Sequence, residues 1–321
     1  MDEQIRLAPD VAARFPQVAR RPDRSAVGSP LSRAVAAAVD VLALTKPRII
    51  VLLLITAFCA MVVADRGVPG VGVTVLTLLG LGLSAGGANA INMWYDRDID
   101  AIMARTKARP VPSGRMAAGW ALTAGIAMQA VSFPLLWVGV GWLPAVLALG
   151  GFIYYVFIYT MGLKRRTPQN IVIGGGAGAF PPLVGWSAVT GHIGIAALLM
   201  FLVIFLWTPP HFWSLALYRE GDYRKANVPM MPVVRGERST KVQSLIYAVV
   251  LGVASVLLYA TGRVGLVYLV VAVVLAIGFV WILGRSLRER LPETRWAKRT
   301  FRYSLLYLTA LFAVMVLNVR P

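Results

Sequence analysis

Charged residues fall into a few clusters along the chain, and long stretches without any charge separate these clusters. Five charge-free stretches follow Asp100: 116–163, 167–218, 242–262, 264–284 and 303–319. A helix needs about 20 apolar residues to cross the hydrocarbon core of a bilayer. The first two stretches are therefore long enough for two spans each, and the last three for one each. Two further apolar stretches precede Asp96, so the pattern predicts an all-α membrane protein with nine spans.

Glycine residues mark where the two longest stretches should break. We expect turns at 138–141 and 189–192, which read Val-Gly-Val-Gly and Val-Thr-Gly-His. A third glycine-rich run, 174–178, lies inside an apolar stretch and follows no predicted strand. We therefore interpret this run as a place of close helix packing rather than as a phosphate-binding loop.

Composition sharpens this picture. Hydrophobic residues make up 58% of the 321 residues and charged residues only 14%, yet the net charge is +18. A chain this apolar is neither a disordered tail nor a good nucleic-acid binder. All basic residues except Arg66, Arg263 and Arg320 fall in the N-terminal segment or in every second loop, so they lie on one side of the predicted membrane. Because Lys and Arg accumulate in cytoplasmic loops, we expect a cytoplasmic N-terminus and a C-terminus outside.

The N-terminal segment differs from the rest of the chain. Residues 1–38 are rich in Arg and contain no apolar core of the length that a secretory signal needs. We predict that they form a mobile, basic cytoplasmic tail. Residues 39–321 should form a single transmembrane domain.

The acidic residues at the end of the second predicted span suggest metal chemistry. Asn92, Asp96 and Asp100 are spaced by four residues, which stacks them on one face of a helix. Two carboxylates and an amide oxygen in such a row suit Mg²⁺, which is commonly held by carboxylates together with substrate phosphates. The alternative is a solvated loop whose acids balance the neighbouring basic residues.

A second acidic spot, with Glu220 and Asp222, ends the sixth predicted span on the same side of the membrane. Each acidic spot is followed by a basic stretch that contains proline, 105–110 after the first and 224–229 after the second. Carboxylates with Mg²⁺ and flanking cations are suited to hold a diphosphate. The repeated arrangement predicts that both spots contribute to one diphosphate site.

Longer motifs connect these residues to a known family. Asn92-x₃-Asp96-x₃-Asp100 with Arg105-Thr-x-x-Arg109-Pro110 resembles the first signature of the UbiA-type intramembrane aromatic prenyltransferases. Further motifs narrow the resemblance, over about residues 42–245, to the protohaem IX farnesyltransferases, or haem O synthases. They are Thr45-Lys-Pro-Arg48, Lys164-Arg-Arg-Thr-Pro-Gln-Asn170 with the glycine-rich run, Trp207-Thr-Pro-Pro-His211-Phe-Trp213, and Asp222-Tyr-x-x-Ala-x-Val-Pro229.

The resemblance implies a fold and a reaction. Members of this family form a nine-helix bundle around a central cavity and transfer a farnesyl group from farnesyl diphosphate to a vinyl group of haem B. The products are haem O and diphosphate, and the cofactor is Mg²⁺. The location implied is the bacterial inner membrane with the active site toward the cytoplasm. Besides the substrates, the partners that the resemblance implies are membrane lipids and a haem A synthase that docks to the protein.

The resemblance also implies roles for single residues. By correspondence with the family motifs, the metal ligands are Asn92, Asp96, Asp100 and Asp222, with the three aspartates catalytic. The diphosphate partners are Arg105, Arg109, Lys164 and Arg165. Family members often carry a further Asp directly before the last one, where this chain has Gly221, and whether Glu220 compensates is open. His211 is either a haem contact or a histidine bonded to a carbonyl that Pro209 and Pro210 set free.

Two rival functions stay open at this point. One is a prenyltransferase of the same superfamily that acts on another aromatic acceptor, such as hydroxybenzoate or a chlorophyll precursor. The other is a secondary transporter whose acids bind ions between structural repeats. Ion sites of transporters lie near the middle of the bilayer, whereas the acids of this chain are expected at helix ends.

Overall fold

The computed structural model describes residues 30–320 of the chain. The chain divides into two units, Met1–Val39 and Asp40–Pro321, and the architecture described below is that of the second unit. Most of the predicted tail, 1–29, lies outside the described residues. From Pro30 to Thr45 the chain is helical, so this helix contains the last nine positions assigned to the tail.

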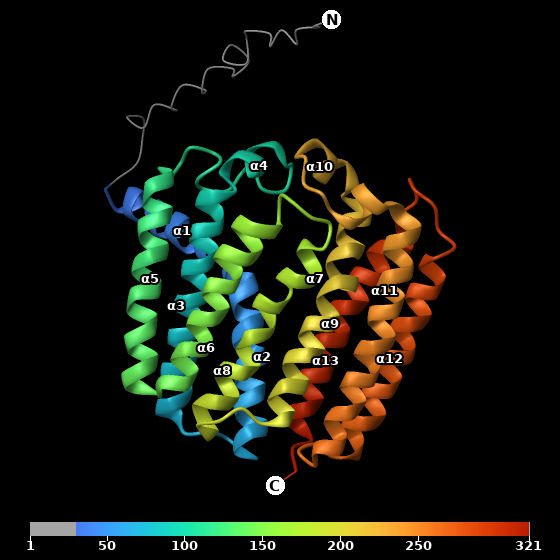
Figure 1. The fold of residues 1–321 in the computed structure, drawn as a ribbon. Coiled ribbons are helices and arrows are strands. Elements are labelled where there is room, and N and C mark those ends of the chain that lie inside the picture. The colour runs from blue at the N-terminus through green and yellow to red at the C-terminus, as the bar shows by residue number, and fades with distance from the viewer. Residues whose placement is uncertain (1–29, 321) are drawn as a thin grey trace, which may run out of the picture. The chain divides into compact units, whose positions relative to one another are not determined.

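Most of the described chain is helical (Figure 1). They are α1 (Pro30–Thr45), α2 (Pro47–Asp65), α3 (Val71–Tyr95), α4 (Arg97–Ile102), α5 (Ala118–Gly139), α6 (Trp142–Ile153), η1 (Tyr154–Leu163), α7 (Asn170–Gly174), α8 (Gly176–Thr190), α9 (Ile195–Tyr218), α10 (Glu220–Lys225), α11 (Met231–Leu257), η2 (Leu258–Thr261), α12 (Leu266–Ser286) and α13 (Arg295–Leu317). The only β-pairing among residues 30–320 is an isolated bridge between Val264 and Val319.

The predicted spans are confirmed. Within the described residues, nine helical segments are long and apolar enough to cross a membrane. The two expected breaks are also found, because α5 ends at Gly139 before α6, and α8 ends at Thr190 before α9. One span is irregular, since α6 continues directly as the π-helix η1 up to Leu163.

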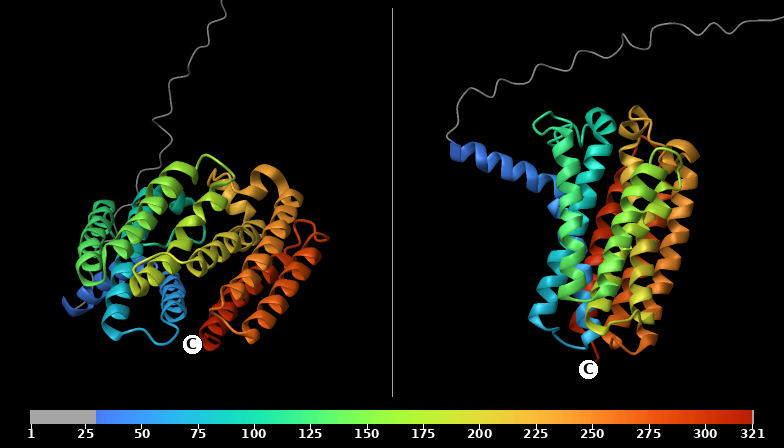
Figure 2. Two further views of the ribbon diagram at one scale, coloured as in Figure 1. Left: turned by 60° about the horizontal axis from the view of Figure 1, so that its bottom comes forward. Right: turned by 60° about the vertical axis from the view of Figure 1, so that its left-hand side comes forward.

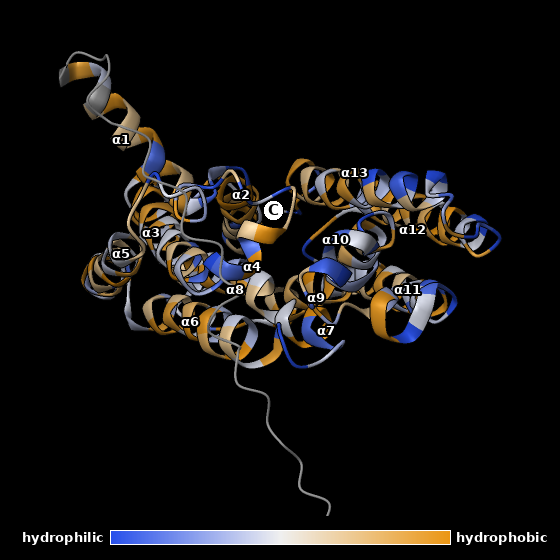
Figure 3. Ribbon diagram, turned by 90° about the horizontal axis from the view of Figure 1, so that it is seen from above, coloured by the Kyte–Doolittle hydropathy of each residue, from blue (hydrophilic) through white to orange (hydrophobic). Residues whose placement is uncertain are grey.

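The long helices run side by side, and the short helices α4 and α10 lie together at one end of them (Figures 1 and 3). The helix α9 packs against α8, α11 and α13, and α13 also packs against α12 and α2. The first and last spans are therefore neighbours, as the turned views in Figure 2 also show. This packing gathers the ends of α3, η1, α9 and the start of α13 at the end that carries α4 and α10.

Apolar side chains lie both inside and outside this bundle. The largest fully buried side chains include Trp186, Trp213 and Tyr268. Large apolar side chains also remain on the surface, with Trp120 71% and Ile277 64% exposed. A helix that is apolar on all sides suits a lipid environment, because the apolar side chains on its surface then contact lipid rather than water.

The glycine-rich run brings helices into close contact, as the sequence predicted. A Cβ atom on Gly174 would lie 2.2 Å from the Tyr159 ring, and one on Gly175 would lie 2.8 Å from Thr208. Farther along α8, a Cβ on Gly185 would lie 2.2 Å from the backbone oxygen of Ala57 on α2. These positions accept only glycine, because the neighbouring atoms occupy the space of a side chain.

Candidate functional site

The end of α3 carries the first acidic motif into a buried position. Asn92, Asp96 and Asp100 are 2%, 0% and 2% exposed. The helical hydrogen bonds continue through the α3–α4 junction, with Asp96 N bonded to Asn92 O at 2.9 Å and Asp100 N to Asp96 O at 2.8 Å. The three residues therefore stack at successive turns, as their spacing predicted. A solvated loop, the alternative for this motif, does not describe these buried side chains.

Each buried carboxylate faces a cation. Lys164, which directly follows η1, forms an ion pair with Asp96 Oδ2. Arg109 Nη1 lies 2.5 Å from Asp100 Oδ2, and the Thr106 hydroxyl donates a hydrogen bond to the Asp100 carbonyl at 2.9 Å. A buried charge is stable only when it is paired in this way. The cations expected to bind diphosphate are thus assembled around the acids expected to bind metal.

Arg165 is shared between two aspartates. Its guanidinium bonds both carboxylate oxygens of the exposed Asp98, at 2.6 and 2.7 Å, and lies 3.4 Å from Asp96 Oδ1. It also lies over the Tyr95 ring, 4.9 Å from its centre. The hydrogen bond from Arg165 lowers the pKa of the Asp98 carboxyl below its usual range. Asp98 therefore holds Arg165 beside the buried pair.

Lys46 is a site residue that the sequence reasoning did not single out. It precedes α2 in a left-handed conformation, with φ at 56°, and its Nζ donates to Asn92 Oδ1 at 2.7 Å. Burial lowers the pKa of the Lys46 ammonium well below its usual range, and the charges of Arg109 and Lys164 act in the same direction. The signal in the sequence is the Thr45-Lys-Pro-Arg48 motif, which contains this lysine but does not by itself indicate what it contacts.

The π-helix η1 supplies the opposite wall of this site. Asn92 Nδ2 donates to Asp96 Oδ2 at 2.7 Å and to Thr160 Oγ1 of η1 at 3.1 Å. A π-helix turns side chains away from the positions that an α-helix would give them, and such segments are frequent at functional sites. In this protein the segment delivers Thr160 and then Lys164 to the end of α3.

The second acidic spot is arranged differently. Glu220 forms an ion pair with Arg224 inside α10, and Asp222 lies 3.8 Å from Arg219. Tyr223 directly follows Asp222, and its hydroxyl lies near the Arg105 guanidinium. Tyr223 belongs to the same buried apolar cluster as Ile99 of α4. The loops of the two motifs therefore pack together, and Arg105 is in no ion pair within residues 30–320.

The donor types fit Mg²⁺, because they are hard oxygen ligands on buried carboxylates. In the described part of the chain, however, no three His, Cys, Asp or Glu side chains lie close enough to hold a metal by themselves. Asp96 and Asp100 alone provide two carboxylates one helical turn apart. Such a set matches a Mg²⁺ site that is completed by substrate phosphate oxygens and water.

His211 lies in an aromatic stack on α9. Its ring stacks on Trp207 at 4.2 Å and on Phe301 of α13 at 4.6 Å, measured between ring centres. His211 Nδ1 lies 2.7 Å from Ser304 Oγ. The Ser304 hydroxyl donates to the Phe301 carbonyl at 2.7 Å, so it accepts its bond from Nδ1–H. Nε2 is then the nitrogen with a free lone pair. His211 thus does not bond to a carbonyl freed by the prolines.

The chain is similar in sequence to a known protein family and to several known proteins. The model of the UbiA prenyltransferase family matches residues 53–306. A protoheme IX farnesyltransferase from Symbiobacterium thermophilum is 58% identical over 280 residues, which cover 87% of this chain and 94% of that protein. A protoheme IX farnesyltransferase from Acidiphilium cryptum is 48% identical over 291 residues, covering 88% and 91%.

Solved structures share the fold. A digeranylgeranylglyceryl phosphate synthase superposes with a TM-score of 0.73 at 18% identity, covering 87% of this chain and 97% of that one. A UbiA homologue from Archaeoglobus fulgidus, solved with GPP and Mg²⁺, superposes with a TM-score of 0.62 at 18% identity, covering 86% and 99%. At this identity the likeness establishes the nine-helix fold alone.

Proposed function

The chain belongs to the UbiA prenyltransferase family, and we propose that it transfers a farnesyl group from farnesyl diphosphate to a vinyl group of haem B. Water then adds to the carbon cation left on the former vinyl group and loses a proton, so haem B, farnesyl diphosphate and water give haem O and diphosphate. The observation that carries this proposal is the identity of 58% to a protoheme IX farnesyltransferase over 94% of that protein's length. The chain is thus an integral membrane prenyltransferase, for which we propose farnesyl diphosphate as the donor and haem B as the acceptor.

The donor end of the proposed site is the α3–α4 junction. Asp96, Asp100, Asn92 and Asp222 would hold Mg²⁺, which when bound neutralises the diphosphate and makes it a better leaving group. Arg105 is in no ion pair in the described chain, and Arg109, Lys164 and Arg165 surround the carboxylates. Arginine binds phosphate oxygens with a planar fork and lysine as a point charge.

Lys46 completes this set of cations. Its ammonium is held by Asn92 and lies near the charges of Arg109, Lys164, Asp96 and Asp100. An anion with several negative charges relieves the repulsion among these cations. We therefore include Lys46 among the diphosphate partners.

Aromatic rings next to the donor end serve the carbon skeleton. The rings of Tyr155 and Tyr159 lie 5.5 Å apart on η1, the helix whose Thr160 hydroxyl contacts Asn92. The face of an aromatic ring stabilises a nearby cation. These tyrosines are suited to stabilise positive charge on the farnesyl C1 as the diphosphate leaves, and to keep water away until carbon–carbon bond formation with the vinyl group.

The acceptor end is proposed to lie on the α9–α13 side. His211 Nε2 accepts no hydrogen bond from any of residues 30–320, and an imidazole nitrogen with a free lone pair is a common haem-iron ligand. Trp207 and Phe301 cover both faces of the imidazole ring. His211 can therefore contact haem only through its edge.

The location and partners are also part of the proposal. We place the protein in the bacterial inner membrane with the acidic end toward the cytoplasm, because most basic residues lie at that end. Its basic loops then contact anionic lipid headgroups. A haem A synthase is the expected recipient of the product.

The rival functions receive less support. Family membership argues against a transporter, and the acids lie at the junction of α3 and α4 rather than within a span. A prenyltransferase for another aromatic acceptor would share the donor site. It would be expected to resemble relatives with another name at comparable identity.

A direct assay tests the proposal. The protein in lipid nanodiscs is incubated with haem B, farnesyl diphosphate and Mg²⁺, and the extracted haems are separated by chromatography. We expect a haem O peak that requires farnesyl diphosphate and that is absent when the donor is omitted. A hydroxybenzoate acceptor is tested in parallel, and prenylation of it in place of haem would overturn the proposal.

A further inference from the structure

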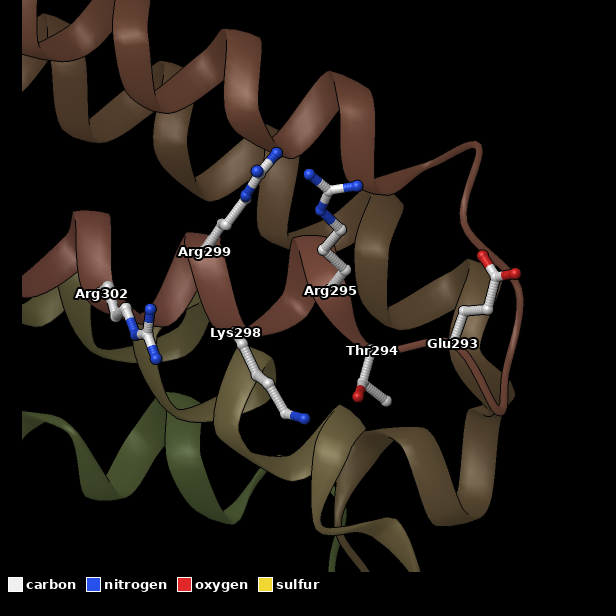
Figure 4. A pocket seen from close by; sticks show the side chains of 6 residues that line it. All are labelled: Glu293, Thr294, Arg295, Lys298, Arg299 and Arg302. Atoms are coloured by element: carbon white, nitrogen blue, oxygen red, sulfur yellow. The ribbon is translucent and has the colours of Figure 1, made fainter.

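A basic hollow lies at the start of α13, apart from the acidic motifs. It has a volume of about 580 Å³ and is lined by Glu293, Thr294, Arg295, Lys298, Arg299 and Arg302 (Figure 4). Four cations and a single acid thus surround one space. Nothing in the donor site accounts for this concentration of positive charge.

Three of the four cations have no hydrogen-bond, ion-pair or ring partner within the described residues. Arg299 lies over the Trp296 ring, 4.6 Å from its centre. The side chains of Arg295, Lys298 and Arg302, by contrast, form no such contact. All three are exposed. Cations gathered without a counter-charge repel one another, and an anion bound between them removes that cost.

The hollow adjoins the aromatic stack of His211. Lys298 lies three residues before Phe301 and four before Arg302, so it is a neighbour of each on the surface of α13, whereas Phe301 and Arg302 are about 100° apart around the helix. Phe301 stacks on His211 at 4.6 Å and contacts Tyr218 at 6.0 Å. The cations therefore lie beside the aromatic cluster that contains His211, namely Trp207, His211, Tyr218 and Phe301.

Tyr218 connects the hollow with the donor site. Its hydroxyl lies within electrostatic range of both Arg302 and Arg105. Figure 1 shows α4, α10 and the loop that leads into α13 at the same end of the bundle. A flat molecule whose anionic edge is bound at Arg302 would thus extend along this aromatic cluster toward Arg105.

The start of α13 is held firmly. The buried Glu289 carboxylate accepts hydrogen bonds from Trp296 N at 2.8 Å and from Ala297 N at 3.2 Å. Lys241 Nζ donates to the Glu289 carbonyl at 2.5 Å. Capping of this kind satisfies the free N–H groups of a first helical turn. The positions of Lys298 and Arg302 are therefore set by the fold.

We propose that Lys298 and Arg302 bind the two propionate carboxylates of the haem acceptor, an inference that rests on the proposed function. Haem B carries its propionates on one edge of the macrocycle and its vinyl groups on the opposite side. Anchoring the propionates at α13 directs the vinyl groups across the bundle to Arg105 and the donor site. The diphosphate has its own cations there, which leaves those of α13 for carboxylates.

Binding of haem B and of its dimethyl ester tests the proposal. Dissociation constants are measured by absorbance, without farnesyl diphosphate, in nanodiscs of neutral lipid. We expect the double variant Lys298→Gln/Arg302→Gln to bind haem B about tenfold more weakly, since each solvent-exposed ion pair contributes up to about fivefold. Its affinity for the ester, which has no carboxylate charge, should equal that of the unchanged protein.

A matched control is Arg288→Gln, because Arg288 is an exposed cation outside the hollow; its affinity for haem B should not change. Equal weakening for haem and ester, or no weakening, would overturn the proposal. So would an effect seen only in nanodiscs with anionic lipid, or a higher KM for farnesyl diphosphate with unchanged haem affinity. Carboxylate-dependent haem binding in a protein that forms no haem O would support the hollow and refute the proposed function.

Discussion

Lys46 Nζ and Asn92 Oδ1 lie 2.7 Å apart and join the start of α2 to the last turns of α3. Because the Asn92 carbonyl oxygen accepts from Lys46, its amide nitrogen is directed to Asp96. One amide therefore connects a cation just before α2 with a carboxylate at the α3–α4 junction. This connection suggests that Lys46 acts in the donor site.

Replacing Lys46 tests that role. We expect Lys46→Gln to raise the KM for farnesyl diphosphate about tenfold or more, since a hydrogen bond to a charged group contributes roughly 1.5–3 kcal/mol. Haem affinity should not change. Arg48→Gln is the control, because Arg48 is exposed two residues away. Equal KM values in both variants would show that Lys46 does not contribute to binding of farnesyl diphosphate.

The buried aspartates should be far more sensitive than their exposed neighbour. We expect Asp96→Asn and Asp100→Asn to lower kcat/KM about 10²-fold or more, which is typical when electrostatic stabilisation of developing charge is lost. Asp98→Asn, on the same turn but 60% exposed in its side chain, should lose much less. Haem O formation is measured after the thermal midpoint of each variant confirms folding. Full activity of Asp96→Asn would refute the metal-ligand assignment.

Removal of divalent metal should stop the reaction. Two carboxylates with Asn92 form an incomplete site, so we expect a chelator to abolish haem O formation and added Mg²⁺ to restore it. Chelated protein should still bind haem B, because the acceptor end contains none of the predicted Mg²⁺ ligands. Undiminished turnover in excess chelator would contradict a role for Mg²⁺.

Ser304 should control the acceptor end through His211. Ser304→Ala removes the acceptor for His211 Nδ1–H, and we expect haem affinity to fall about 2–10-fold, as for one ordinary hydrogen bond. The absorption spectrum of bound haem should change, while Ser304→Thr, which keeps the hydroxyl, should retain it. If His211→Ala leaves both spectrum and affinity unchanged, His211 is not a haem contact.

Two glycines of α8 give a test of the fold. Gly185→Ala would place a Cβ atom 2.2 Å from the Ala57 carbonyl oxygen, and overpacking of this kind costs about 1–3 kcal/mol. Gly178 has no neighbouring atom within 4 Å, so Gly178→Ala should be neutral or stabilising through helix propensity. Thermal unfolding in detergent compares the two. A Gly185→Ala protein as stable as Gly178→Ala would contradict the packing of α8 on α2.

Much of the fold follows from local properties of the sequence. The number of spans and the breaks at 138–141 and 189–192 were correct, because a charge inside the hydrocarbon core is costly whatever the tertiary structure. The stacking of Asn92, Asp96 and Asp100 was also correct, since helical period alone produces it. The assignment of these residues to a metal, and of Asp222 to the same site, stays a prediction.

Contacts between distant segments required the tertiary structure. Asp96 meets Lys164 across 68 positions, Asn92 meets Lys46 across 46, and His211 meets Ser304 across 93. Sequence spacing says nothing about such pairs, because they form only when separate helices pack. The sequence by itself therefore determined which residue types share a face of each helix and how often the chain crosses the membrane. Only helix packing decided which cation neutralises each buried carboxylate, since burial makes pairing obligatory but leaves the partner to geometry.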